Sequence, residues 1–91
     1  MLNVRYGRRF KKELQKVLQQ PGHTPEKLAS VVDLLRADSP LPPKYDDHKL
    51  IGRYEGYREC HIMPDWLLIY KMELETLTLV LVRTGSHSDL F

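Results

Sequence analysis

The sequence predicts a single α+β domain, residues 1–91, in which two helices pack on one face of a small, mainly antiparallel, twisted sheet. Two patterns support this prediction. Apolar residues recur at helical spacing before Pro40, whereas from Tyr54 onward they alternate or run continuously, as residues in strands do. With 91 residues the chain has room for only one small core.

The first helix is predicted over residues 7–20, after a short strand over residues 4–6. Phe10, Leu14 and Val17 repeat at helical spacing, with basic residues between them. Pro21 and the glycine after it then stop the helix.

The second helix has a clear start signal. Thr24 is suited to be the N-cap, and Pro25 to be the first helical residue. The helix should end near Asp38. Its apolar residues form a stripe that predicts packing on the same core, and they are Leu28, Val31, Val32 and Leu35. The prolines after it then predict a rigid loop that leads to residues 44–48.

Three strands are predicted in the second half of the chain. Residues 56–62 and 66–72 form a hairpin around the turn at Pro64, and residues 77–84 follow a second turn. The last strand is rich in leucine and valine on both faces, which is typical of a central strand covered on both sides. A short tail completes the chain.

Positive charge is concentrated near the amino terminus. The net charge is +2, but residues 1–20 contribute +5 and residues 21–91 contribute −3. Such a basic patch can bind phosphates or an acidic partner, or can be an ordinary solvated helix face. The basic residues of the helix that we expect to meet an acidic partner are Arg8, Arg9 and Lys12.

Cysteine content and hydropathy indicate the compartment. Cys60 is the single cysteine and cannot form an intramolecular disulfide, which suits a reducing environment. No apolar run is long enough to span a bilayer, and no signal-peptide pattern follows Met1. We therefore expect a cytoplasmic protein with no membrane partner.

Three of the four histidines, His48, His61 and His87, lie near predicted strand ends or loops in the second half of the chain. Histidine exchanges protons near neutral pH, so two or three that converge on a sheet face could serve as acid and base. They could also be unrelated surface residues. Strand alternation puts His61 on the polar face with Glu59, and Cys60 on the opposite face, which argues against a Cys-His dyad and places Cys60 in the core.

Three other residues have two interpretations each. Asp65 is either ordinary turn chemistry or a functional carboxylate near His61. Trp66 is more often a core residue than a ligand contact, and Arg83 is either a snorkelling cation at a strand end or a phosphate anchor. The histidines and Asp65 are scattered singly and lack the paired spacing of zinc ligands, so no metal site and no cofactor is predicted.

Several segments resemble the YafQ branch of the RelE/ParE toxins. They are "DHKL" at residues 47–50, "GRYEGYRECHIMPDWLLIY" at 52–70 and "VRTGSHSDLF" at 82–91. The resemblance implies a sheet like that of microbial ribonucleases, whose concave face carries the catalytic residues, and a cognate antitoxin as partner. The catalytic residues that it implies are His48, His61, Asp65 and His87. The substrate contacts that it implies are Phe91 and, more loosely, Trp66 and Arg83.

The function that this resemblance implies is ribosome-dependent cleavage of mRNA by a type II toxin. We expect the ribose 2′-hydroxyl to attack the neighbouring phosphate, so that no metal is required, with His87 as the acid that protonates the departing 5′ oxygen. Operator DNA is expected to be a partner only through the antitoxin complex. Two alternatives are a non-enzymatic toxin that binds DNA gyrase, as ParE toxins do, and a pure module for binding antitoxin or DNA.

Overall fold

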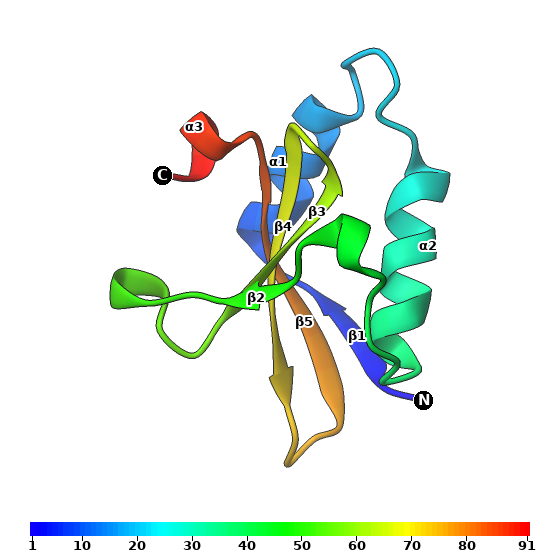
Figure 1. Ribbon diagram of the computed structural model, residues 1–91, viewed down its shortest axis with the longest axis vertical. Coiled ribbons are helices and arrows are strands. Elements are labelled where there is room, and N and C mark those ends of the chain that lie inside the picture. The colour runs from blue at the N-terminus through cyan, green and yellow to red at the C-terminus, as the bar shows by residue number, and fades with distance from the viewer.

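The computed structural model describes all residues, 1–91, and has an α+β architecture built on one five-stranded sheet (Figure 1). The elements in chain order are β1 (Asn3–Tyr6), α1 (Arg8–Val17), α2 (Pro25–Arg36), β2 (His48–Lys49), β3 (Arg58–Met63), β4 (Trp66–Glu73), β5 (Thr78–Gly85) and α3 (His87–Leu90). Two short 3-10 helices, η1 (Pro43–Tyr45) and η2 (Gly52–Tyr54), flank β2.

The strand order is β1-β5-β4-β3-β2, in which only the β1–β5 pair is parallel. The prediction of a mainly antiparallel sheet with two helices on one face is therefore confirmed. β5 lies between β1 and β4, and its residues are mostly buried, as the apolar run on both faces predicted. None of the helices combines the length and the apolar character that a membrane span requires.

The amino-terminal elements follow their local signals. Thr24 caps α2, because its hydroxyl accepts a hydrogen bond from the Lys27 backbone N–H, and Pro25 is the first helical residue. α1 ends at Val17, three residues earlier than predicted, and a turn fills residues 18–22. Gly7 precedes α1 at a close approach to β5, where an added Cβ would lie 2.9 Å from the Leu81 carbonyl oxygen.

The two faces of the sheet differ in what covers them. The main core lies between the helices and one face; it contains Phe10 and Val31 from the helices and Cys60, Trp66 and Leu68 from the strands. Cys60 is fully buried, as predicted, and burial raises the pKa of its thiol.

The other face is covered only in part. Leu67 and Ile69 of β4 form a small second cluster with Leu90 of α3, and Leu50, Tyr54, Tyr57 and Val82 pack at its edges. In Figure 1 the segment of residues 43–57 crosses in front of the sheet, with α1 behind it. We call this partly covered side the open face; its polar side chains form the candidate site.

Two elements were not predicted. β2 has only two residues, and α3 lies in the segment that was expected to be a simple tail. Asp46 has a left-handed backbone, φ 47°, and turns the chain from η1 into β2. In α3, Ser86 and Asp89 form a capping box, in which each side chain accepts a hydrogen bond from the backbone N–H of the other.

Candidate active site

The open face brings together two of the predicted catalytic histidines. β2 pairs with β3 so that His48 lies opposite Glu59, and His61 follows two residues later on the same face. The Glu59 carboxylate then lies between the two imidazoles. Its Oε1 is 3.6 Å from His48 Nε2 and 3.3 Å from His61 Nε2.

Glu59 is a buried carboxylate, with a side chain only 6% exposed. Its position beside two imidazoles makes it a functional candidate that the sequence did not single out. Alternation had placed Glu59 on the face of His61, but the position of His48 depends on the pairing of β2, which leaves no periodic signal. A second acid, Asp46, is 3.6 Å from His61 Nε2 through its Oδ2.

The tautomer of His48 follows from its backbone contact. Its Nδ1 is 2.8 Å from the carbonyl oxygen of Asp46, and because a carbonyl can only accept, Nδ1 must carry the proton and donate. In the neutral ring the lone pair is therefore on Nε2, the atom that faces Glu59. The His48 ring is therefore held between a backbone carbonyl at Nδ1 and the Glu59 carboxylate, 3.6 Å from Nε2.

His87 lies on α3 above the same face. The Leu90 side chain of α3 packs on Leu67 and Ile69, and Leu67 is paired with both His61 and Gly85, the last residue of β5. With strands about 4.8 Å apart, His61 and Gly85 are about 10 Å apart across the sheet. His87 follows Gly85 by two residues, is exposed, and packs against Phe91 with ring centroids 5.1 Å apart.

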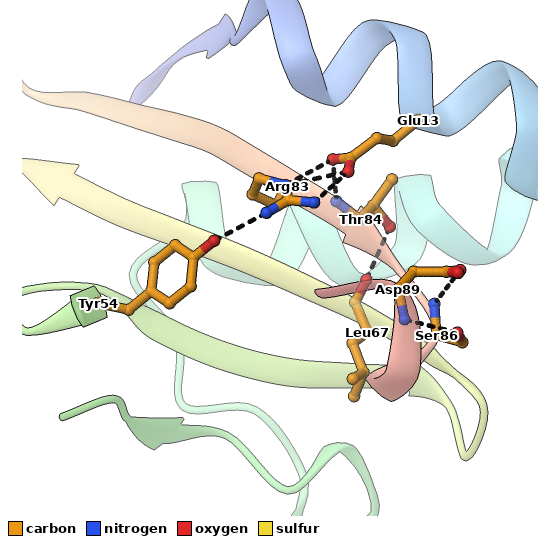
Figure 2. A network of polar contacts seen from close by, with 7 residues as sticks. All are labelled: Glu13, Tyr54, Leu67, Arg83, Thr84, Ser86 and Asp89. Carbon is orange, nitrogen blue, oxygen red and sulfur yellow. Dashed lines mark hydrogen bonds and ion pairs between the residues drawn. The ribbon is translucent and has the colours of Figure 1, made fainter. Parts of the chain in front are cut away.

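Arg83 is held rigidly on the same face (Figure 2). Its guanidinium donates to both carboxylate oxygens of Glu13 in α1, at 2.6 to 3.0 Å, and to the Tyr54 hydroxyl at 2.8 Å. The hydrogen bonds to Glu13 raise the pKa of Arg83, and its side chain is only 8% exposed. The register pairs Ile69 with both Arg83 and Glu59, so all three lie in one row across the sheet.

Two hollows flank this row. One, of about 560 Å³, lies between α2, η1 and β3 and includes His61, Asp46 and Lys44 in its lining. The other, of about 590 Å³, lies beside α3 and includes Arg83, Tyr54 and Phe91. The two hollows share no lining residue.

Known proteins share the sequence pattern and the fold of this chain. Residues 2–91 match the family described as the bacterial toxin of type II toxin-antitoxin systems, YafQ. The chain belongs to the YafQ toxin family.

The mRNA interferase toxin YafQ of Escherichia coli K12 is 38% identical over 90 residues, which cover 98% of this chain and 95% of that protein. A metal-bound toxin from Helicobacter pylori has a similar structure, with a TM-score of 0.92, 43% identity and full coverage of both chains. YafQ in the E. coli DinJ-YafQ complex gives a TM-score of 0.82 at 37% identity, over 100% of this chain and 99% of that one.

Two predicted residues of this YafQ-family chain lie apart from the histidine pair. Asp65 is in the β3–β4 turn, and the imidazole within 4 Å of its carboxylate is that of His23, at 3.5 Å, rather than that of His61. Trp66 has no exposed surface; its indole stacks on His23 and donates to the Thr84 hydroxyl at 2.8 Å. This position is at odds with a direct contact between Trp66 and substrate.

The basic patch of the YafQ-family chain lies on α1, where Arg8, Arg9 and Lys12 are exposed and form no ion pair. Glu13, the one acid among the first 20 residues, is bound to Arg83.

No group of three or more histidine, cysteine, aspartate or glutamate side chains is arranged to hold a metal ion.

Proposed function

We propose that the protein is the toxin of a type II toxin-antitoxin pair and cleaves mRNA on the ribosome, by general acid-base chemistry on the open face of its sheet. The observation that carries the proposal is the His48–Glu59–His61 cluster, across the same face from His87 and Arg83. The name and fold of the E. coli relative, an mRNA interferase, support the activity. The cytoplasm, where messages are translated, is the compartment in which it would act.

In this mechanism the message supplies its own nucleophile. His48 or His61 removes the proton from the ribose 2′-hydroxyl, whose oxygen attacks the adjacent phosphorus and displaces the 5′ oxygen of the next nucleotide. His87 donates the proton that the departing oxygen takes up. Each positioned proton transfer is typically worth about 10² to 10⁴ in rate.

The remaining residues have supporting roles. Arg83, fixed by Glu13 and Tyr54, stabilises negative charge that develops on the phosphate oxygens. Phe91 is 53% exposed and can stack on a base. Asp65 and Trp66 remain proposed site residues; their contacts with His23 favour a role in positioning the β3–β4 turn.

The nucleophile is tested with programmed ribosomes and a message that carries a 2′-O-methyl sugar at the cut site. We expect the modified message to resist cleavage and the parent message to be cut in the presence of excess chelator. Because a toxin from H. pylori has been solved with bound metal, the chelator experiment is informative. Normal cutting of the methylated message, or activity restored by zinc alone, would contradict the mechanism.

The acid is tested with a message whose 5′ bridging oxygen at the cut is replaced by sulfur. A thiolate leaves without protonation, so a His87→Ala variant should be slow on the ordinary message and approach the parent rate on the sulfur message. Variants of His48 and His61 should gain no such rescue. Equal impairment of His87→Ala on both messages would assign His87 to positioning or phosphate contact instead.

For the antitoxin, we propose that an acidic segment docks on the exposed basic residues of α1, which are Arg8, Arg9 and Lys12. The DinJ-YafQ complexes of E. coli support a protein partner of this kind, and contact with operator DNA would then come through that complex. Replacing the three residues with glutamate should slow association and weaken its salt dependence, measured by stopped-flow at low ionic strength. Unchanged association rates would place the docking surface elsewhere.

A further inference from the structure

The hollow beside α3 is built from three separate parts of the chain. α1 contributes Arg9, the segment around η2 contributes Arg53 and Tyr54, and the carboxyl-terminal segment contributes Arg83 and Phe91. Its volume is about 590 Å³, within the range of small-molecule sites. Three guanidinium groups and two aromatic rings therefore line one cavity.

The guanidinium groups differ in how they are paired. Arg83 already pairs with Glu13 and donates to the Tyr54 hydroxyl, as Figure 2 shows. Arg9 and Arg53 are exposed and have no carboxylate within 4 Å.

One carboxylate, that of Asp89, also lines the cavity, but its Oδ2 accepts the Ser86 backbone N–H in the cap of α3. The two unpaired arginines thus leave the cavity with an excess of positive charge that an anion can neutralise. Arginine is suited to bind phosphate because its planar fork of N–H donors matches the phosphate oxygens.

The aromatic rings supply a flat apolar wall. Tyr54 and Phe91 contact edge to face, with ring centroids 5.8 Å apart. This contact uses only part of Phe91, which remains 53% exposed. An exposed ring beside a cationic cavity is the arrangement on which bases of single-stranded nucleic acids stack.

We propose that this cavity binds one nucleotide of an RNA strand, with its phosphate held by Arg9 and Arg53 and its base stacked on Phe91 beside Tyr54. The inference rests on the proposed function, since the bound nucleotide would be a neighbour of the one that is cut. Arg83 joins the two sites: it lines the cavity and shares a sheet row with Glu59, about 10 Å away at the strand spacing.

Binding is measured with a fluorescein-labelled RNA pentanucleotide whose sugars are all 2′-O-methyl, so that cleavage plays no part. Arg9→Ala and Arg53→Ala should each weaken binding several-fold, and the two together should lower the slope of log affinity against log salt by about 0.7, the value for one phosphate contact on a single strand. Phe91→Ala should weaken binding about tenfold through lost stacking. Arg8→Ala is the matched control, because Arg8 is the neighbouring exposed cation of α1 and does not line the cavity.

The outcomes are distinct from those of the cleavage experiments. The pentanucleotide carries no free 2′-hydroxyl and cannot be cut, so a failure of the acid-base mechanism would leave its binding intact. If Arg9→Ala and Arg53→Ala bind no worse than Arg8→Ala, or if the parent does not bind at millimolar RNA, the cavity is not a nucleotide site.

The nucleotide could come from the message or from ribosomal RNA, which share the same chemistry. An abasic residue placed in turn on the 5′ and 3′ side of the cut separates these sources on programmed ribosomes. If the message supplies the base, one abasic position should slow cleavage as much as Phe91→Ala does, and the two changes together should cost no more than either alone. If ribosomal RNA supplies it, the abasic message and Phe91→Ala should act independently.

Discussion

The two faces of one sheet carry different kinds of side chain, and the difference is clearest along β3. Cys60 and Ile62 point into the helix-covered core, whereas Glu59 and His61 point to the open face. The helix-covered face is almost wholly apolar and sealed. The open face has a narrow apolar strip, Leu67 and Ile69, bordered by imidazoles, a buried carboxylate and a fixed guanidinium. A single strand can therefore fill the core with one set of residues and present titratable groups on the open face with the alternate set.

The largest difference in stability between variants of the two faces should come from Trp66. Trp66→Ala removes a fully buried ring that stacks on His23, so unfolding in urea should show a loss of about 3–5 kcal/mol. Trp66→Phe keeps most of the volume and loses the bond to Thr84, at a cost of about 1–2 kcal/mol. Phe91→Ala, on the exposed side, should change stability by less than about 0.5 kcal/mol.

The activity of Trp66→Phe completes this comparison. If Trp66 acts only through packing, the folded variant should cut programmed ribosomes at close to the parent rate. A large loss of cleavage in a variant that remains folded would show that the indole contacts substrate after rearrangement.

The complementary prediction concerns Glu59. Glu59→Gln keeps the shape of the side chain and removes the charge between His48 and His61, so single-turnover cleavage should fall by about 10², while stability changes little. His61→Ala should have a similar effect, and the double variant should be little worse than either single one, because the groups act as a unit. Glu55→Gln, in the exposed segment after η2, is the control and should cut normally. Additive losses would mean that Glu59 acts independently of the pair.

How far the sequence predicts each face depends on whether the signal is local. Helices and strands follow from apolar periodicity, and Thr24 and Pro25 mark the start of α2 within a few residues. β2 escapes prediction because two residues have no period, and it exists only through pairing with β3. α3 was missed because its four residues are mostly polar, although the Ser86 and Asp89 capping box is a readable signal.

The site was predicted less completely than the fold, because its contacts span long sequence separations. Arg83 and Glu13 are 70 residues apart, so their ion pair leaves no trace in either segment. Asp65 is close to His61 in sequence, but the turn directs its carboxylate to His23. Alternation along the strand could place His61 and Glu59 on one face. The position of His48 beside them could not be predicted, because it depends on the pairing of β2 with β3.

Between the two faces, the network around Asp47 should have an intermediate effect. Its Oδ1 accepts from the Tyr70 hydroxyl at 2.6 Å and from Arg58 Nε at 3.2 Å, and this anchors the chain next to His48. Asp47→Asn should cost about 1–2 kcal/mol of stability and lower kcat about tenfold while KM changes less, because His48 is displaced. Asp33→Asn on the exposed side of α2 serves as control. A pure loss of stability with kcat unchanged would remove Asp47 from the positioning of His48.

The smallest effect should come from the cap of α3. There a change of pH tests whether α3, on the open face, can be destabilised while the sheet stays intact. The Ser86 backbone N–H donates to Asp89 and holds the pKa of that carboxyl below its ordinary value of 3.8. Because the folded pKa is the lower one, the carboxylate stabilises α3 at all pH values above 3.8, and this contribution is lost as pH falls through the folded pKa. The carboxyl is exposed, so solvent screening limits the effect to a few tenths of a kcal/mol.

Amide exchange of Leu90, whose N–H donates to the Ser86 carbonyl, should therefore accelerate at low pH relative to that of Leu79 in β5, beyond the intrinsic pH dependence of exchange. Asp89→Asn should exchange faster at pH 6 and lose the acid-dependent change, whereas Glu73→Gln, which removes another carboxyl with a lowered pKa far along β4, should behave as the parent. Equal acid sensitivity in the parent and in Asp89→Asn would mean that the α3 cap does not depend on this charge.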